Sequence, residues 1–281
     1  MNYQWYPGHM TKALRQMRED IKLIDLVIEI VDARIPYSSK NPDIDTLALG
    51  KSRIIILNKA DLADTKVTSL FEDYYKKQGF YVLCADSRNK VSFKSLNELV
   101  GKACAAKIEK DRKRGIVNRS IKAMVVGIPN VGKSTFINTF SGKAGAKTGN
   151  KPGVTKGKQW IRMGKDLDLL DTPGILWPKF ESQKQGMKVA LVGSINDAIV
   201  DNTELCCYLI EFLVKNYPDS LSQRYGIAYE ENTESHIILN DICEKKNCMN
   251  KGGIPDTVRM ANMIIDDLRS GKLGRISLDR I

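Results

Sequence analysis

The sequence predicts an α/β domain followed by an all-helical domain, with the boundary near residue 178. Two patterns predict this fold class. Up to residue 178, short runs rich in Val and Ile alternate with amphipathic stretches, as in a doubly wound sheet with helices on both faces. After that point only helical spacing recurs. We therefore expect one domain over residues 1–178 and another over residues 179–281.

The first domain begins with an amphipathic helix, because Met10, Leu14, Met17, Ile21 and Ile24 recur at spacings of three and four residues. Six runs that we expect to form strands follow, at 26–31, 53–58, 81–85, 122–127, 158–163 and 166–171. Several of them are almost entirely apolar, which is typical of parallel strands buried on both faces.

The second domain has two clear helical patterns. One follows Asn202-Thr203, which can cap a helix, and the other lies between Asp256 and Gly271. No convincing strand pattern occurs after residue 178.

The composition is globular, with an excess of positive charge. Hydrophobic residues make up 42% and charged residues 27% of the 281 residues, which argues against a disordered chain. The net charge of +11 suggests a polyanionic partner. The excess of basic residues is concentrated in two stretches of the chain. Residues 101–122 contain eight basic and two acidic residues, and residues 141–165 contain seven basic residues and no acidic one.

No apolar run approaches the roughly 18 residues of a membrane span, so we expect no membrane partner. The start has no apolar signal core, and none of the six cysteines forms a CxxC pair. These features favour a cytoplasmic protein with reduced thiols.

A phosphate-binding loop follows the fourth strand run. Residues 127–134, GIPNVGKS, match GxxxxGK[ST] between a strand and a helix start. In such loops backbone N–H groups face phosphate oxygens, the lysine reaches the β- and γ-phosphates, and the hydroxyl binds Mg²⁺. The residues expected to hold the phosphates are Asn130, Val131, Gly132, Lys133, Ser134 and Thr135, with Ser134 also on Mg²⁺.

A guanine-recognition sequence follows the second strand run. Asn58-Lys59-Ala60-Asp61 matches NKxD, in which the carboxylate of Asp61 accepts hydrogen bonds from N1–H and the exocyclic amine of guanine. Adenine offers no such pair of donors. Cys84-Ala85 ends the third run, where GTPases commonly place Ser-Ala to contact guanine O6 through the backbone, so the cysteine is a departure.

Two further sequence elements are expected to lie near the γ-phosphate and its Mg²⁺. Asp171-Thr172-Pro173-Gly174 matches DxxG, with Asp171 expected near Mg²⁺ and the amide of Gly174 near the γ-phosphate. Thr155, in Pro152-Gly153-Val154-Thr155, is the candidate switch threonine that completes the coordination of Mg²⁺. Lys133 and Thr155 are therefore candidate catalytic residues.

These elements occur in an unusual order. In ordinary GTPases the motifs occur in the order phosphate loop, switch threonine, DxxG, NKxD and Ser-Ala. In this chain NKxD is the first of these motifs and DTPG is the last. The order indicates a circular permutation. It also places the γ-phosphate segment directly before the helical domain, so we hypothesise that GTP controls the orientation of that domain.

Several motifs together resemble one family. They are WYPGHM at 5–10, DARIP at 32–36, GIPNVGKS at 127–134 and DTPGI at 171–175. The chain resembles, over essentially its whole length, the ribosome biogenesis GTPase A (YlqF) family of circularly permuted GTPases. The resemblance implies a circularly permuted Ras-like P-loop GTPase domain and a C-terminal helical domain that contacts ribosomal RNA.

The resemblance also implies a function, a GTP-hydrolysing assembly factor in late maturation of the bacterial large ribosomal subunit. Such a factor binds rRNA-rich particles in a GTP-dependent way and leaves after hydrolysis. Its hydrolysis is slow alone and stimulated by the particle. We expect the protein to act as a monomer.

The residue after DTPG is Ile175, which cannot orient the attacking water as a glutamine does. His9 of the opening motif is a candidate for that task; alternatively it belongs to a structural or RNA-contacting turn. In similar GTPases an asparagine placed like Asn130 helps hold K⁺ against the phosphates, which predicts K⁺ as a cofactor beside GTP and Mg²⁺. Alternatively, Asn130 only caps the loop.

Other functions remain open at this point. They are an RNA-binding GTPase switch of another ribosome-associated process, a mitochondrial counterpart, a plain RNA-binding protein with a degenerate nucleotide site, and an ATP-dependent kinase. The intact phosphate loop opposes the degenerate site, and Asn58-Lys59-Ala60-Asp61 opposes ATP. The start lacks an Arg- and Ser-rich leader, which disfavours mitochondria, although a mature form would lack one.

Overall fold

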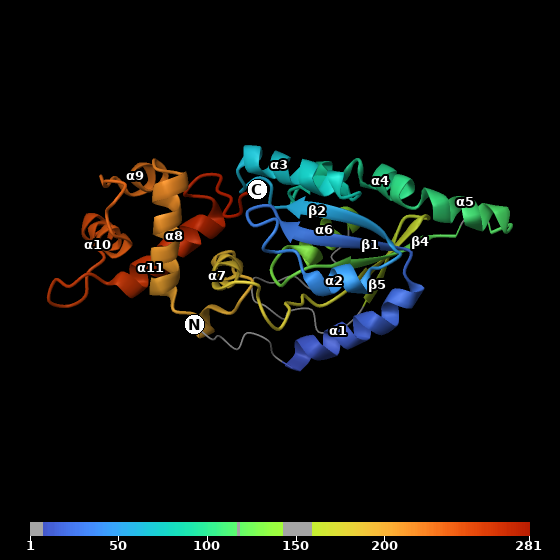
Figure 1. Ribbon diagram of the computed structural model, residues 1–281, viewed down its shortest axis with the longest axis horizontal. Helices are drawn as coiled ribbons and strands as arrows, with labels where there is room; N and C mark the ends of the chain where they lie inside the picture. The colour runs from blue at the N-terminus through green and yellow to red at the C-terminus, as the bar shows by residue number, and fades with distance from the viewer. Residues whose placement is uncertain (1–7, 117–118, 143–158) are drawn as a thin grey trace.

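A single six-stranded sheet forms the centre of the N-terminal part of the molecule (Figure 1). The computed structural model describes residues 8–116, 119–142 and 159–281. The strand order is β3-β2-β1-β4-β6-β5. The strands are β1 Leu26–Asp32, β2 Ser52–Asn58, β3 Tyr81–Ala85, β4 Ile121–Val126, β5 Gln159–Met163 and β6 Leu167–Asp171. All six predicted runs therefore form strands, with ends that differ by at most one residue.

β5 is the exception to the parallel arrangement, because it pairs antiparallel with β6. β5 ends at Met163 and β6 begins at Leu167. So short a connection permits a hairpin, whereas a parallel pair needs a crossover of a dozen or more residues. The other neighbouring strands are parallel.

Helices cover both faces of the sheet, as the alternating pattern predicts (Figure 1). Alternate residues of β2 enter opposite hydrophobic clusters, because successive side chains of a strand point to opposite faces. Ile55 and Leu57 pack with Phe71 of α3, while Ile54 and Ile56 belong to the larger cluster that contains Phe136 of α6. The helices of this part are α1 Gly8–Asp20, η1 Ile21–Leu23, α2 Pro42–Leu47, α3 Thr65–Lys77, η2 Lys90–Phe93, α4 Leu96–Ala103, α5 Ala105–Lys113 and α6 Lys133–Ser141.

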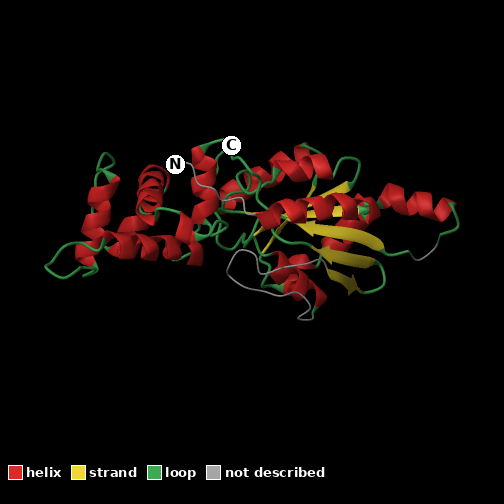
Figure 2. Ribbon diagram, turned by 90° about the horizontal axis from the view of Figure 1, so that it is seen from below, coloured by secondary structure: helices red, strands yellow, loops and turns green. Residues whose placement is uncertain are grey.

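Residues 179–281, here called the helical segment, contain helices and no strand beyond an isolated bridge between Met249 and Pro255. Figure 2 shows these helices beside the sheet-containing part. They are α7 Gln183–Leu191, η3 Asp197–Ile199, α8 Asn202–Asn216, α9 Ser220–Tyr225, α10 Ser235–Lys245 and α11 Thr257–Ser270.

The two helices predicted in this segment are present as α8 and α11. The carboxylate of Asp256 caps α11 by accepting a hydrogen bond from Arg259 N, and Gly271, with a φ of +78°, follows the last residue of α11. The cap of α8 differs from the prediction, because Asp201 rather than Asn202-Thr203 accepts the hydrogen bonds of the first turn.

The hydrophobic core continues across residue 178. One cluster of buried side chains extends from Met10 in α1 to Leu278 near the C-terminus. The C-terminal residues also return to the sheet-containing part, where Leu278 N donates to Arg34 O at 2.6 Å and Asp279 accepts from the backbone N and hydroxyl of Ser38. The division at residue 178 therefore stays a prediction. In the part of the chain that the structure describes, no helix is long and apolar enough to span a bilayer.

The sheet has a topological switch point between β1 and β4. From β1 the order continues to β2 and β3 on one side, and from β4 it continues to β6 and β5 on the other. In open α/β sheets ligands bind outside the carboxyl ends of the strands at such a point. The fold therefore indicates where the functional site lies.

Candidate nucleotide-binding site

The phosphate loop connects β4 to α6 and depends on two glycines. Gly127 has a φ of +150°, and a Cβ there would lie 2.4 Å from Ile30 O. Gly132 has a φ of +101°, and a Cβ there would lie 2.3 Å from Asn58 Nδ2. Only glycine tolerates these positions, because both the backbone conformation and the space exclude a side chain. Ser134 and Thr135 follow in the first turn of α6.

Lys133 is buried beneath the loop. Its Nζ donates to Gly127 O at 3.1 Å and to Ile128 O at 2.9 Å. Desolvation by burial lowers the pKa of Lys133, and the charge of Asp171 partly offsets this effect. A buried ammonium group held by carbonyl oxygens suits a site whose ligand carries negative charge, as phosphate does.

Asp171, at the end of β6, is buried, and one of its carboxylate oxygens lacks a hydrogen-bond partner in the described chain. Its Oδ1 has no hydrogen-bond partner among the described residues. Burial raises the pKa of Asp171, although the charge of Lys133 opposes the rise. An unpartnered buried carboxylate oxygen close to the phosphate loop fits Mg²⁺, which takes one or two protein ligands and keeps waters and phosphate oxygens as the others. Ser134 and Asp171 would hold the ion there.

The DTPG segment lies against the phosphate loop. A Cβ on Gly174 would lie 2.8 Å from both Lys133 Nζ and Pro129 Cα, so this position also requires glycine. The next residue, Ile175, donates its N–H to Gly127 O at 3.3 Å and has a fully buried side chain. Ile175 therefore serves the core and is not exposed to an attacking water.

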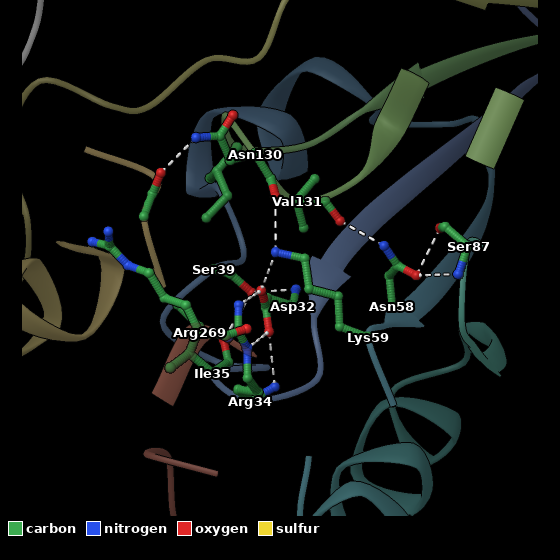
Figure 3. A network of polar contacts seen from close by, with 12 residues as sticks. Asp32, Arg34, Ile35, Ser39, Asn58, Lys59, Ser87, Asn130, Val131 and Arg269 are labelled. Atoms are coloured by element: carbon green, nitrogen blue, oxygen red, sulfur yellow. Dashed lines mark hydrogen bonds and ion pairs between the residues drawn. The ribbon is translucent and has the colours of Figure 1, made fainter. Parts of the chain in front are cut away.

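Asn58 joins the guanine-recognition sequence to two other loops. Its Nδ2 donates to Val131 O at 2.6 Å, and its Oδ1 accepts from the N–H and hydroxyl of Ser87 at 2.9 and 2.7 Å (Figure 3). The loops after β2, β3 and β4 thus meet at one buried amide. Ala60 N also donates to Ala85 O at 3.1 Å, which places the predicted Cys84-Ala85 backbone beside this sequence.

Lys59 contacts a residue to which the sequence analysis gave no role. Its Nζ lies 3.0 Å from Asp32 Oδ2 and donates to Asn130 O at 2.8 Å. Asp32 ends β1 and also forms a buried ion pair with Arg34 at 2.7 Å. Burial alone would raise the pKa of Asp32, but the charges of Arg34 and Lys59 outweigh it and hold that pKa well below its usual value.

Asp32 and Arg34 belong to the DARIP motif, which the sequence analysis used only as a mark of resemblance. One signal could have found them. Asp32 is a charged residue directly at the carboxyl end of a largely apolar strand, as Asp171 is. In a parallel sheet, such ends gather at one edge.

Asp61 has one paired and one unpaired oxygen. Its Oδ2 accepts from Arg88 Nη2 at 2.6 Å, whereas Oδ1 is buried and has no partner in the described chain. Arg88 also bonds both carboxylate oxygens of Asp86. A carboxylate with an unsatisfied buried oxygen suits the N–H donors of guanine. Cys84 points elsewhere, since its Sγ donates to Glu72 Oε2 of α3 and burial raises its pKa to about 12.

Three predicted residues need separate mention. The side chain of Asn130 donates from Nδ2 to Gly193 O at 2.6 Å, so it contacts the helical segment. Thr155 lies outside the described residues. His9 is in the first turn of α1, but its side chain is also outside the description.

Comparison of this chain with known proteins indicates its family. A family model described as 50S ribosome-binding GTPase matches residues 122–241. The ribosome biogenesis GTPase A of Priestia megaterium is 45% identical over 99% of this chain and 97% of its own length. The mitochondrial ribosome-associated GTPase 1 of Ictalurus punctatus is 35% identical over 98% of this chain and 92% of its own.

A solved structure has the same fold. The GDP-bound structure of TM YlqF matches with a TM-score of 0.67 and 26% identity, over 95% of this chain and 99% of that one. The sequence, the site and these relatives agree, and the chain belongs to the ribosome biogenesis GTPase A family, a family of GTPases.

Proposed function

We propose that the protein hydrolyses GTP as an assembly factor in late maturation of the bacterial large ribosomal subunit. It binds an rRNA-rich particle in its GTP-bound form and leaves after hydrolysis. One structural observation carries the nucleotide part of the proposal. The amide of Asn58 bonds the phosphate loop at Val131, while Asp61, three residues later, keeps a buried carboxylate oxygen without a partner in the described chain.

The names of the relatives support the ribosomal part of the proposal. Bacterial relatives named ribosome biogenesis GTPase A reach 45% identity, against 35% for a mitochondrial relative, which favours a bacterial, cytoplasmic factor. The basic side chains Lys110, Arg112 and Arg114 are exposed at the end of α5. Such a group suits the phosphates of ribosomal RNA. We propose a monomer with two domains that meet near residue 178.

Nucleotide competition and turnover test this function. GDP and GTP should displace a fluorescent GDP analogue at concentrations where ATP does not, and Asp61→Asn should remove that preference. Turnover alone should be on the order of 10⁻⁴ to 10⁻² s⁻¹. Purified large subunits should raise it, and the stimulation should fall steeply as salt rises. Equal competition by ATP, or no stimulation by large subunits, would contradict the proposal.

The hydrolysis step requires a group that orients water, since Ile175 is buried. We propose His9 for this role and K⁺, held with the help of Asn130, as a neutralising charge. Single-turnover hydrolysis on ribosomal particles should slow in His9→Ala, and turnover should be faster in KCl than in NaCl. An unchanged rate in either experiment removes the corresponding group from the mechanism.

A further inference from the structure

The C-terminal end of α7 is held by an arginine from another helix. Arg269, in the last turn of α11, donates from Nε to Leu191 O and from Nη2 to Ala190 O, both at 2.9 Å. Its two terminal nitrogens also bond both carboxylate oxygens of Asp197, at 2.8 and 2.7 Å. The last carbonyls of a helix have no partner inside the helix, so Arg269 satisfies them and fixes the end of α7 against α11.

The phosphate loop also contacts the residues that follow α7. Gly193 lies two residues after α7, with a φ of +78°, and its N–H donates to Ala190 O at 2.9 Å. Its carbonyl accepts from Asn130 Nδ2 at 2.6 Å. Residues 190–193, here called the α7 end, therefore contact α11 through Arg269 and the nucleotide site through Asn130.

A second route connects Arg269 to the nucleotide site (Figure 3). Arg34 Nη1 donates to Arg269 O at 3.4 Å, and Arg34 pairs with Asp32. Asp32 pairs with Lys59, whose Nζ donates to Asn130 O. Together with the α7 end, these contacts form a closed ring that contains two predicted nucleotide-binding residues, Lys59 and Asn130.

The ring supports an unfavourable backbone conformation. Asn130 has a φ of +57° and Lys59 a φ of +60°, in the left-handed region that residues other than glycine rarely adopt. Such conformations persist only where surrounding contacts hold them. The ring holds Asn130 on both sides, since its side chain bonds Gly193 and its carbonyl bonds Lys59.

We propose that Arg269 is a positioning residue for the nucleotide site, which it affects through the α7 end and Asn130 without touching the nucleotide. The proposal rests on the proposed guanine nucleotide site. By thermodynamic reciprocity, if fixing the α7 end favours nucleotide binding, nucleotide binding must also fix the α7 end. The helical segment is thus coupled to the phosphate loop directly, beside the chain connection after DTPG.

The rate of dissociation of a fluorescent GDP analogue tests this coupling. Arg269→Met should raise that rate about fivefold or more, in the range typical of coupling between sites. Arg269→Lys should give a smaller increase, because one ammonium group can hold fewer of the acceptors than a guanidinium. Asp197→Asn weakens the anchoring of Arg269 at a more exposed position and should act in the same direction.

Arg224→Met is the matched control. Arg224 also belongs to the helical segment and, like Arg269, pairs with an acidic residue, since its Nε lies 2.7 Å from Oδ2 of Asp267 in α11. It has no part in the ring. The control should therefore keep the wild-type dissociation rate to within about twofold, well below the coupling range, even if its thermal stability falls as much as that of Arg269→Met.

Amide hydrogen exchange supplies a second measurement. GDP should slow exchange of the α7 end in the wild-type protein, and this protection should be lost in Arg269→Met or, if that variant does not fold, reduced in Asp197→Asn. Wild-type dissociation rates and undiminished protection in the folded variants would overturn the inference. A wild-type protein that binds no GDP would instead overturn the proposed function, so the two failures are distinct.

Discussion

The part of the site around Asp32, Asn58 and Lys59, here called the base side, differs from the part around Lys133 and Asp171, here called the phosphate side. The difference lies in whether each buried charged group has a partner within the protein. On the base side, Asp32 is buried between Arg34 and Lys59, and both polar atoms of the Asn58 amide are bonded. On the phosphate side, burial lowers the pKa of Lys133 and raises that of Asp171, whose Oδ1 has no partner in the described residues. Around Asp32 the charges are balanced by the protein alone, whereas Asp171 on the phosphate side, like Asp61 beside the base, keeps an oxygen for a ligand.

The difference has an energetic meaning. A buried ion pair with complete hydrogen bonding loses stability when one partner is removed. A buried charge that lacks a partner costs stability in the empty protein and is retained for what it binds. Substitution of Asp32, whose charge is balanced within the protein, should therefore act mainly on folding, and substitution of the phosphate-side residues mainly on binding.

The largest effect is expected for Lys133→Met. The substitution removes an ammonium group that would make two charge-assisted hydrogen bonds to phosphate, each worth about 1.5–3 kcal/mol. Affinity for GDP and GTP should then fall at least about 100-fold, as measured by displacement of a fluorescent GDP analogue. The exposed Lys179→Met is the control and should bind normally. A fall of less than about tenfold would mean that Lys133 does not contact the phosphates.

Asp32→Asn should act on folding instead. It leaves Arg34 and Lys59 without a balancing carboxylate in a buried place, which typically costs about 3–5 kcal/mol. Urea unfolding of the nucleotide-free protein measures this loss. Asp25→Asn is a suitable comparison, because Asp25 pairs with the more exposed Arg119 at the other end of β1 and should cost much less. Equal losses in the two variants would mean that the buried charges around Asp32 contribute no more to stability than a more exposed ion pair does.

The folding stability of the nucleotide-free protein should depend on pH through Asp171. Burial raises its pKa from 3.8 to about 6 in the empty protein. Because the folded-state pKa is the higher one, the stabilising contribution of the protonated carboxyl is complete below 3.8 and is lost as the pH rises through about 6. Empty Asp171→Asn protein should therefore be more stable than wild type at pH 8 and equally stable at pH 4.

The same group should control the binding of Mg²⁺-nucleotide. Below about pH 6 the metal must displace a proton from Asp171, so affinity should fall by up to about tenfold per pH unit. Asp171→Asn keeps the titration of the nucleotide itself and loses this component, so the difference between the two profiles isolates the carboxyl. Identical profiles would mean that Asp171 does not ligate the metal.

Local patterns predicted much of this molecule. Strand runs such as RIIILN are read from neighbouring residues, and the structure has β2 where that run lies. The glycines at 127 and 132 were placed by the motif, and their backbone angles and lack of space agree with it. The parallel strands brought the loops after β2 and β4 together, because β1 pairs with both strands and the carboxyl ends of parallel strands share one edge.

Some features were missed although they are local. The direction of β5 was set by a short connection, and the cap of α8 by which of several neighbouring polar residues reached the first N–H groups. Others depended on residues far apart in the chain. The link between Asn130 and Gly193 spans 63 residues, and no spacing rule predicts it.

The sequence by itself determined the nucleotide motifs, the strands and the permuted order, because short-range patterns encode the residue types that phosphate, guanine and buried strands require. Only the tertiary structure decided which charges balance one another. It paired Asp32 with Lys59 and placed Arg269 at the end of α7. The physical reason is that a buried polar group needs a partner within about 3 Å, and folding alone selects which distant residue provides it.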